Sequence, residues 1–235
     1  MRVLLLIVIC LIQSVSLGQG FVPENRAEYK ATQVIPVETS VLEDKLVATD
    51  PANAVGLVTR TDNSTGSCVV IEKTTKLKDG WLGLAVTANH VMEHQSSVKV
   101  TYFTGRRAMG CAVVAANNEV DLAIIRVWVP DEVTPVSIET ENPDGDVLLI
   151  GYPESKPGFL SGKFLRRDKG NLYAHVLNRP GFSGGGVFHK GKLVGCISGG
   201  WYWTKDDNGK QATWPAKAAD GESIASLLEK ARSRK

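Results

Sequence analysis

The sequence predicts an all-β protein, and three features support this expectation. Short apolar runs recur along residues 54–198, and clusters of glycine, asparagine, aspartate and serine separate them. Many short strands at regular spacing, with turn residues between them, are typical of a β-barrel or a β-sandwich. Only one segment, close to the C-terminus, has helical periodicity, and the chain contains no internal repeat.

The chain begins with a segment that has the form of a secretory signal. Arg2 precedes an unbroken apolar run from Val3 to Ile12, and small residues follow at Ser16 and Gly18. This run is too short to span a bilayer as a helix, so a short membrane anchor is the less favoured interpretation. We expect residues 1–18 to be removed as a signal peptide. The mature protein is then secreted or periplasmic, without a stable membrane anchor.

Residues 19–51 form a polar segment of mixed composition with three prolines. The absence of a repeating apolar pattern indicates an N-terminal arm or a pro-segment. Over the whole chain, 27 basic residues nearly balance 25 acidic residues, for a formal net charge of +2. This balance gives no argument for a nucleic-acid partner, and we expect no nucleic acid to bind.

The apolar runs define the expected strands in order along the chain. Residues 121–129 form a near-continuous apolar run, as expected for a strand buried on both faces. Residues 129–146 are rich in proline and acidic residues, and we expect them to join two halves of the β structure. The expected strands are 54–60, 68–73, 83–91, 97–103, 111–116, 121–129, 146–153, 171–177, 185–190 and 192–198.

The one predicted helix lies at the C-terminus. Its apolar face has the i, i+3, i+4 and i+7 spacing of an amphipathic helix. Asp220 is a suitable N-cap, and the basic residues after 229 suit the negative end of the helix dipole. The residues of the apolar face are Ile224, Leu227, Leu228 and Ala231.

Three cysteines remain after removal of the predicted signal: Cys68, Cys111 and Cys196. Export permits a disulfide, and an odd number leaves at least one thiol unpaired within a monomer. The sequence leaves two possibilities, a Cys68–Cys111 pair with Cys196 free, or three free thiols. The spacing of the cysteines and histidines does not match a zinc site, and we expect no metal and no cofactor.

Three stretches carry residues of types that take part in catalysis. Ser183 lies in "NRPGFSGGGVF", where glycines permit an unusual turn or a close backbone approach. A nucleophilic serine needs a base and a group that orients the base. His90 lies in "TANHV", which ends an apolar strand, although a histidine at a strand end is often structural or merely exposed. Asp121 opens the apolar run "DLAIIRVWV", where its carboxylate needs a hydrogen-bond partner unless it points to water.

The stretches "TANHV", "VDLAII" and "GFSGG" follow one another in the order His, Asp, Ser, and "LLIGYP" and "LVGCISGG" accompany them. Over residues 52–230 this set resembles the trypsin-like serine proteases of the chymotrypsin fold, most closely the compact bacterial branch with the HtrA-type proteases. The resemblance implies two six-stranded antiparallel β-barrels with a C-terminal α-helix. The first barrel is then expected within residues 52–132, and the second barrel with the helix within 133–235.

The resemblance also implies roles for individual residues. His90 would be the general base, Asp121 would orient and stabilise its imidazole, and Ser183 would be the nucleophile of an acyl-enzyme mechanism. The backbone N–H groups of Gly181 and Ser183 would form the oxyanion hole. The implied substrate is a protein or peptide, and the oligomeric state is left open. The implied substrate-binding residues are Leu177, Ser198, Gly199 and Gly200.

The sequence departs from the family pattern in two respects that bear on activation and regulation. Phe182 occupies a position that is usually Asp or Asn, so it cannot pair with a new N-terminal ammonium as in zymogen-activated proteases. We expect the Phe182 ring to pack beneath the turn instead. We also expect a compact protease unit without a PDZ-like domain.

Two other interpretations remain to be weighed. "GFSGG" also fits the G-x-S-x-G elbow of α/β-hydrolases, but that elbow needs a helix after the serine, and the residues that follow Ser183 favour strand and turn. The stronger alternative is a catalytically inactive, protease-like β-barrel module that binds peptides or partner proteins, because fold alone does not determine activity.

Overall fold

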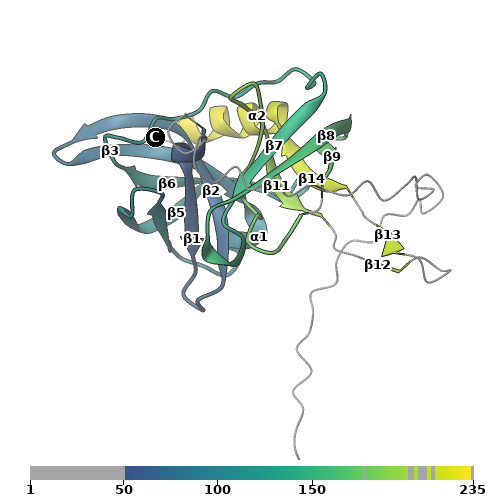
Figure 1. Ribbon diagram of the computed structural model, residues 1–235. Coiled ribbons are helices and arrows are strands. Elements are labelled where there is room, and N and C mark those ends of the chain that lie inside the picture. The colour runs from purple at the N-terminus through teal and green to yellow at the C-terminus, as the bar shows by residue number, and fades with distance from the viewer. Residues whose placement is uncertain (1–50, 177, 201–203, 206–210, 213–214, 234–235) are drawn as a thin grey trace, which may run out of the picture. The chain divides into compact units, whose positions relative to one another are not determined.

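The computed structural model describes residues 51–176, 178–200, 204–205, 211–212 and 215–233. Their strands form two closed barrels of six antiparallel strands each, and β12 (Thr204–Lys205) pairs separately with β13 (Gln211–Ala212). Figure 1 shows the first barrel in blue to teal and the second in green to yellow. The helix α2 (Gly221–Arg232) follows the last strand. The predicted fold class, two six-stranded barrels with a C-terminal helix, is therefore confirmed.

The first barrel closes in the order β1-β2-β3-β6-β5-β4. Its interior consists largely of valine, isoleucine and alanine side chains, of which valine and isoleucine favour extended strands. Four consecutive residues of β6 are buried, in agreement with the expected strand covered on both faces. The strands are β1 (Val55–Thr59), β2 (Thr65–Leu77), β3 (Gly80–Ala88), β4 (Val98–Tyr102), β5 (Arg107–Asn117) and β6 (Leu122–Val129).

The second barrel closes in the order β10-β11-β14-β9-β8-β7. A separate apolar cluster fills it, with Leu149, Leu172 and Ile197 fully buried. A 3₁₀ turn, η3 (Pro153–Ser155), follows β7. The strands are β7 (Asp146–Gly151), β8 (Gly158–Asp168), β9 (Asn171–His175), β10 (Gly186–His189), β11 (Lys192–Gly199) and β14 (Ala216–Asp220).

Two strands of the second barrel were not among those expected. In β8, Leu160 is the one buried residue, and most of the remaining positions alternate between half-buried and exposed. Its sequence "GFLSGKFLRRD" therefore lacks a continuous apolar run. The strand β14 reads "AKAAD", and alanine has low β-propensity. Its pairing with both β11 and β9 keeps it extended.

The segment between the barrels runs along both of them. The Val136 N–H donates to the carbonyl oxygen of Val70 in β2 at 3.1 Å. Three residues later, the Glu139 N–H donates to the carbonyl oxygen of Leu193 in β11 at 2.8 Å. These bonds give a proline-rich connection defined positions on each barrel.

The helix α2 packs its apolar face into the same cluster that fills the first barrel, although it follows the second barrel in sequence (Figure 1). The four residues of the predicted apolar face are all buried. The Asp220 side chain accepts a hydrogen bond from the Ser223 N–H at 2.9 Å, as expected for an N-cap. Asp220 is also nearly fully buried, and its Oδ2 lies 3.4 Å from Arg167 Nε.

The three cysteines in the described part of the chain are free and buried. Of the two possibilities left by the sequence, the structure therefore has three free thiols. Burial raises the pKa of Cys68 far above its usual value and that of Cys111 to about 11. Burial, followed by the negative charge of Asp121, also raises the pKa of Cys196. Protonated, buried thiols of this kind are poor nucleophiles and poor metal ligands.

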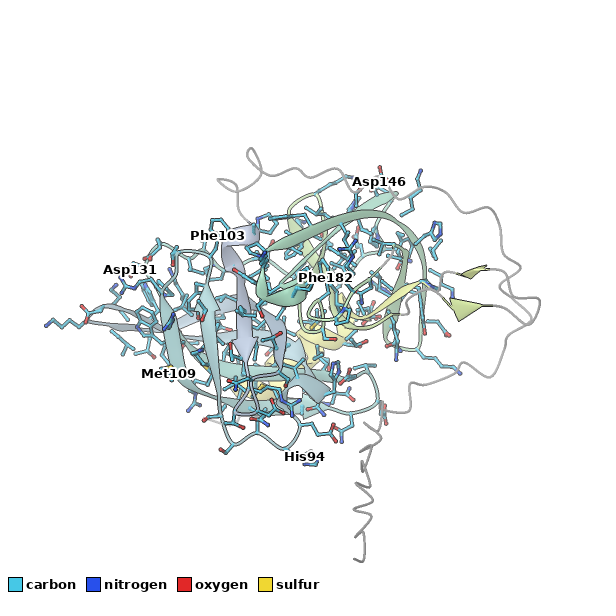
Figure 2. The ribbon with its side chains drawn as sticks, turned by 60° about the horizontal axis from the view of Figure 1, so that its bottom comes forward. His94, Phe103, Met109, Asp131, Asp146 and Phe182 are labelled. Carbon is cyan, nitrogen blue, oxygen red and sulfur yellow. The ribbon has the colours of Figure 1, made fainter. Side chains whose placement is uncertain are left out.

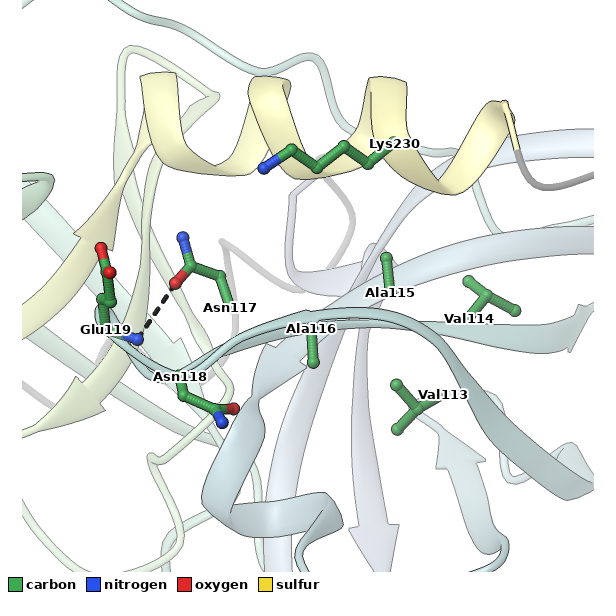
Figure 3. A pocket seen from close by; sticks show the side chains of 8 residues that line it. All are labelled: Val113, Val114, Ala115, Ala116, Asn117, Asn118, Glu119 and Lys230. Carbon is green, nitrogen blue, oxygen red and sulfur yellow. Dashed lines mark hydrogen bonds between the residues drawn. The ribbon is translucent and has the colours of Figure 1, made fainter.

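A shallow groove of about 690 Å³ lies between β5 and α2 (Figure 3). Residues 113–119 and Lys230 line it, and the Glu119 N–H donates to Asn117 Oδ1 at 3.0 Å at one end. None of the predicted site residues belongs to this lining. Separately, no helix in the described residues is long and apolar enough to cross a bilayer.

We predict that Asp220→Ala lowers the free energy of unfolding by about 2–3 kcal/mol, because it removes the N-cap and one partner of a buried ion pair. Asp220→Asn keeps an oxygen for the cap and should cost less. Urea unfolding followed by circular dichroism measures both changes. Equal losses in the two variants would show that the cap contributes nothing to stability.

Candidate active site

His90 and Asp121 lie side by side at the ends of two paired strands. His90 is the second residue of α1 (Asn89–Met92), which directly follows β3, whereas the sequence placed it on a strand. Asp121 immediately precedes β6, and Ala88 pairs with Leu122. The His90 ring Nδ1 lies 2.6 Å from Asp121 Oδ2, and the His90 backbone N–H donates to Oδ1 at 2.8 Å. Both carboxylate oxygens therefore bond to the same residue.

The backbone around this pair is held by further hydrogen bonds. Asp121 has a φ of +56°, which is uncommon outside glycine, although Asp tolerates it better than most residues. Its carbonyl oxygen accepts from the Asn89 N–H at 3.0 Å. The Arg60 guanidinium donates to the carbonyl oxygens of His90 at 3.2 Å and Glu93 at 3.1 Å. Together these bonds hold α1 in position at the end of β3.

Ser183 lies in the second of two consecutive turns that share Phe182. In the first, the Phe182 N–H donates to the Arg179 carbonyl oxygen at 3.2 Å, with Gly181 at the third position. In the second, the Gly185 N–H donates to the Phe182 carbonyl oxygen at 2.8 Å, with Ser183 at the second position. Gly181 has a φ of +94°, and with proline before it the first turn has the form of a type II turn.

The glycines of this motif are required by both conformation and space. Gly184 also has a positive φ, +84°. A Cβ on Gly184 would lie 2.0 Å from the carbonyl oxygen of Ser67, and one on Gly181 would lie 2.5 Å from that of Tyr152. A side chain at either position would therefore displace the double turn from the neighbouring backbone. The glycines shape the turn that presents Ser183.

The double turn and the His90–Asp121 pair meet across one short segment of β2. A Cβ on Gly66 would lie 2.8 Å from the side chain of Val91, next to His90, and 3.1 Å from the carbonyl oxygen of Ser183. Gly66 thus lies between the two parts of the site. Among the hydrogen bonds of the described residues, none joins Ser183 Oγ to the His90 ring. Such bonds are often long in ligand-free enzymes and tighten when substrate binds.

Phe182 packs beneath the double turn, as expected from the sequence. It is 1% exposed, and Figure 2 shows it within the second barrel. A Cβ on Gly151 would lie 2.8 Å from its ring, and one on Gly158 would lie 3.2 Å from the ring tip. Larger residues at these two positions would collide with the aromatic ring. Apolar packing therefore occupies the place beneath the turn.

The residues expected to bind substrate lie partly within the described structure. Ser198 is buried near the end of β11, and Gly199 and Gly200 are half-buried. Asn178 is buried, and its side-chain N–H donates to the carbonyl oxygen of Gly199 at 3.1 Å. This bond brings the segment before the double turn to the end of β11. Leu177 lies outside the described residues.

The sequence analysis did not identify three residues that hold this site together. They are Arg60, Ser67 and Asn178. Ser67 is fully buried in β2 and bonds to the double turn. No local pattern marks any of them, because a single polar residue beside a turn or within a strand has no distinctive spacing. Their contacts depend on tertiary structure.

The fold and the arrangement of these residues define a two-barrel peptidase of the chymotrypsin type. The model of the trypsin-like peptidase domain matches residues 66–196, more than half of the chain. The chain therefore belongs to the trypsin-like peptidase domain family, a family of serine proteases that act on proteins or peptides. No curated protein matches the chain in sequence.

Solved structures, two of them of proteases, have the same fold. Rv3671c from M. tuberculosis H37Rv, an inactive form carrying a serine-to-alanine mutation, has a TM-score of 0.61 and 17% identity, covering 86% of this chain and 97% of its own. A serine endoprotease from Yersinia pestis has a TM-score of 0.59 and 20% identity, covering 77% and 63%. The HtrA-type protease AlgW, a serine-to-alanine variant with a tripeptide, has a TM-score of 0.59 and 19% identity, covering 76% and 60%.

We predict that Phe182→Ala reduces both stability and activity, because the double turn loses the ring that supports it. Loss of a buried phenylalanine side chain typically costs about 3–5 kcal/mol. Phe188→Ala is the matched control, since Phe188 is equally buried in β10 but lies outside the double turn. Hydrolysis of labelled casein per folded molecule should fall in Phe182→Ala alone. Equal rates in the two folded variants would exclude a supporting role for Phe182.

Proposed function

We propose that this protein is an exported serine endopeptidase that cleaves peptide bonds with Ser183, His90 and Asp121 through an acyl-enzyme. The observation that carries the proposal is the double contact of the Asp121 carboxylate with the His90 ring and backbone, at 2.6 and 2.8 Å. A carboxylate on Nδ1 keeps the proton on that nitrogen and leaves Nε2 free to accept another. The proposed export rests on the signal-like residues 1–18.

The first half of the reaction transfers the acyl group to the enzyme. Ser183 Oγ attacks the carbonyl carbon of the scissile bond while its proton passes to His90 Nε2. The carbon–oxygen bond forms, and the electron pair of the carbonyl moves to its oxygen. His90 then gives the proton to the amide nitrogen, the carbon–nitrogen bond breaks, and the amine leaves. Asp121 stabilises the imidazolium that exists between these two proton transfers.

The negative oxygen needs donors that are in position before the reaction. We assign this function to the backbone N–H groups of Gly181 and Ser183. The type II form of the turn at 179–182 supports the assignment, because it fixes the orientation of the peptide that carries the Gly181 N–H. Removal of one such donor costs about 10²–10³ in turnover in a serine protease.

The second half of the reaction uses the same groups with water as the nucleophile. His90 takes a proton from water, and the resulting oxygen attacks the ester carbon of the acyl-enzyme. The proton then returns from His90 to Ser183 Oγ as the ester bond breaks. The acid product leaves, and the enzyme regains its starting protonation state.

The experiment that tests the proposal compares the wild type with Ser183→Ala. The wild type should cleave labelled casein and react with a fluorophosphonate probe. Ser183→Ala should lose labelling and about 10⁶ in turnover while unfolding at the same urea concentration. Continued labelling of the variant would identify a different nucleophile. A folded wild type that neither labels nor cleaves would favour the inactive, peptide-binding module.

We further predict that the primary pocket prefers a small or medium-sized, uncharged apolar side chain. Ser198, Gly199 and Gly200 are assigned to its wall and Leu177 to its base, and none of them carries a charge. A cleavage profile over a peptide library measures the preference directly. A profile dominated by Lys, Arg, Asp or Glu at the cleaved position would contradict this assignment.

A further inference from the structure

Ser67 makes four hydrogen bonds at the contact between the two barrels. Its hydroxyl donates to the Gly181 carbonyl oxygen at 2.7 Å and accepts from the Tyr152 N–H at 2.9 Å. Its backbone N–H donates to the Ser183 carbonyl oxygen at 2.7 Å. Its own carbonyl oxygen accepts from the Thr87 hydroxyl at 2.7 Å. Three of these four bonds join the first barrel to the second.

The position of Ser67 in β2 leaves its backbone available for these bonds. The ladder between β2 and β3 begins at Val69, which pairs with Val86. Ser67 lies two residues before that pair, so its backbone groups find their partners outside the ladder. Since Ser67 is fully buried, water does not compete for any of them. The hydroxyl both donates and accepts, which a serine or threonine side chain can do at one position.

Ser67 bonds to the two residues that are assigned to the oxyanion hole. The carbonyl oxygens of Gly181 and Ser183 both accept from Ser67, one from its hydroxyl and one from its backbone. The N–H groups of the same two residues are the proposed donors to the oxyanion. Holding a carbonyl group fixes the peptide plane that follows it. The 181–182 and 183–184 peptide planes are therefore restrained from the first barrel, and each directly follows the peptide that carries one of the proposed donor N–H groups.

We propose that Ser67 is a positioning residue for the oxyanion hole, an inference that rests on the proposed function. Ser67 does not touch the substrate. It holds the Gly181 carbonyl in the 181–182 peptide, and this limits rotation of the adjoining 180–181 peptide, which in the type II turn directs the Gly181 N–H to the oxyanion. Rotation of that peptide, as in a type I turn, would turn the N–H away.

This positioning acts on the transition state more than on substrate binding. The negative charge on the oxygen exists only after attack, so a misplaced donor lowers turnover without a matching change in substrate affinity. A residue that serves stability alone would lower the amount of folded enzyme and leave the kinetics of each folded molecule unchanged. The two possibilities therefore differ in kcat, KM and the affinity for a tetrahedral mimic.

The test uses the full-length chain as wild type, Ser67→Ala, Ser67→Cys and the control Tyr102→Phe. Ser67→Ala removes the hydroxyl, and Ser67→Cys replaces it with a weak donor of similar shape. Tyr102 is 1% exposed in the first barrel, and its hydroxyl donates to the Trp128 carbonyl oxygen. Tyr102→Phe therefore removes one buried hydrogen bond from the same barrel without touching Gly181 or Ser183.

Two probes are measured with each protein. The first is a p-nitrophenyl ester of an acylated alanine, which gives kcat and KM. The second is a peptidyl boronic acid with alanine next to boron, which gives an inhibition constant. Ser183 Oγ bonds to boron, its proton passes to His90, and a boron-bound oxygen occupies the place of the oxyanion. Fluorescence of the aromatic residues in urea measures the stability of each variant.

We expect Ser67→Ala to lower kcat about 10- to 100-fold with KM within about twofold, and to weaken boronate binding by a similar factor. Ser67→Cys should change the same quantities in the same direction by less. Tyr102→Phe should lose stability and keep kcat and boronate affinity within about twofold. If Ser67→Ala does not fold, the same selective loss in Ser67→Cys supports the proposal.

Three results would overturn the inference while the proposed function stands. They are wild-type kcat and boronate affinity in a folded Ser67 variant, a rise in KM without a fall in kcat, and an equal kinetic loss in Tyr102→Phe. A folded wild type that neither hydrolyses the ester nor binds the boronate would instead overturn the proposed function. The wild-type measurement thus separates the two failures.

Discussion

The carbonyl groups of Gly181, Ser183 and Gly185 and the Gly184 N–H have hydrogen-bond partners outside their own turns, and this requirement governs how the two barrels meet. The Gly184 N–H donates to the Ile197 carbonyl oxygen at 2.7 Å, and the Ile197 N–H donates to that of Gly185 at 2.8 Å. The carbonyl groups on the other side bond to Ser67. A buried backbone group without a partner costs about 1–3 kcal/mol, so the barrels are stable together only in an arrangement that satisfies both sides.

The same requirement accounts for the composition of the motif. Partners from two barrels approach the chain so closely that a single added carbon at Gly184 would fall within 2.0 Å of a carbonyl oxygen. The large apolar side chain of Phe182 is buried beneath the double turn, on the side that these partners do not occupy. The sequence "GFSGGG" therefore combines small residues where the backbone is approached with one large residue where it is supported.

Much of the fold could be predicted because hydrophobic periodicity reports burial directly. The expected runs at 121–129, 146–153 and 192–198 correspond to β6, β7 and β11. The C-terminal helix and its Asp220 cap were predicted with their roles. The sequence analysis did not predict strands β8 and β14, because their extended form depends on pairing with neighbouring strands rather than on a local apolar pattern. The short helix α1 was also not predicted, because its four residues are too few to show a helical hydrophobic period.

The candidate site likewise contains residues that the sequence predicted and residues that it did not. His90, Asp121 and Ser183 were singled out because each has a distinctive local context, and the structure brings His90 and Asp121 into contact. The residues that hold them, such as Ser67 and Arg60, have ordinary contexts. Ser67 contacts Gly181, 114 positions further along the chain, and one sequence carries no signal for a contact at that separation. The reactive groups are therefore more visible in the sequence than the groups that orient them.

The placement of α2 has a consequence for the order in which the molecule folds. The helix is the last described element of the chain, yet Ile224, Leu227 and Leu228 belong to the apolar cluster of the first barrel. That cluster stays incomplete until nearly the whole chain has been synthesised. Contacts between such distant segments slow folding, because the loop between them must close first. The first barrel to be synthesised is thus the last to have its apolar cluster completed, and loss of the helix would expose the apolar side chains that Ile224, Leu227 and Leu228 cover.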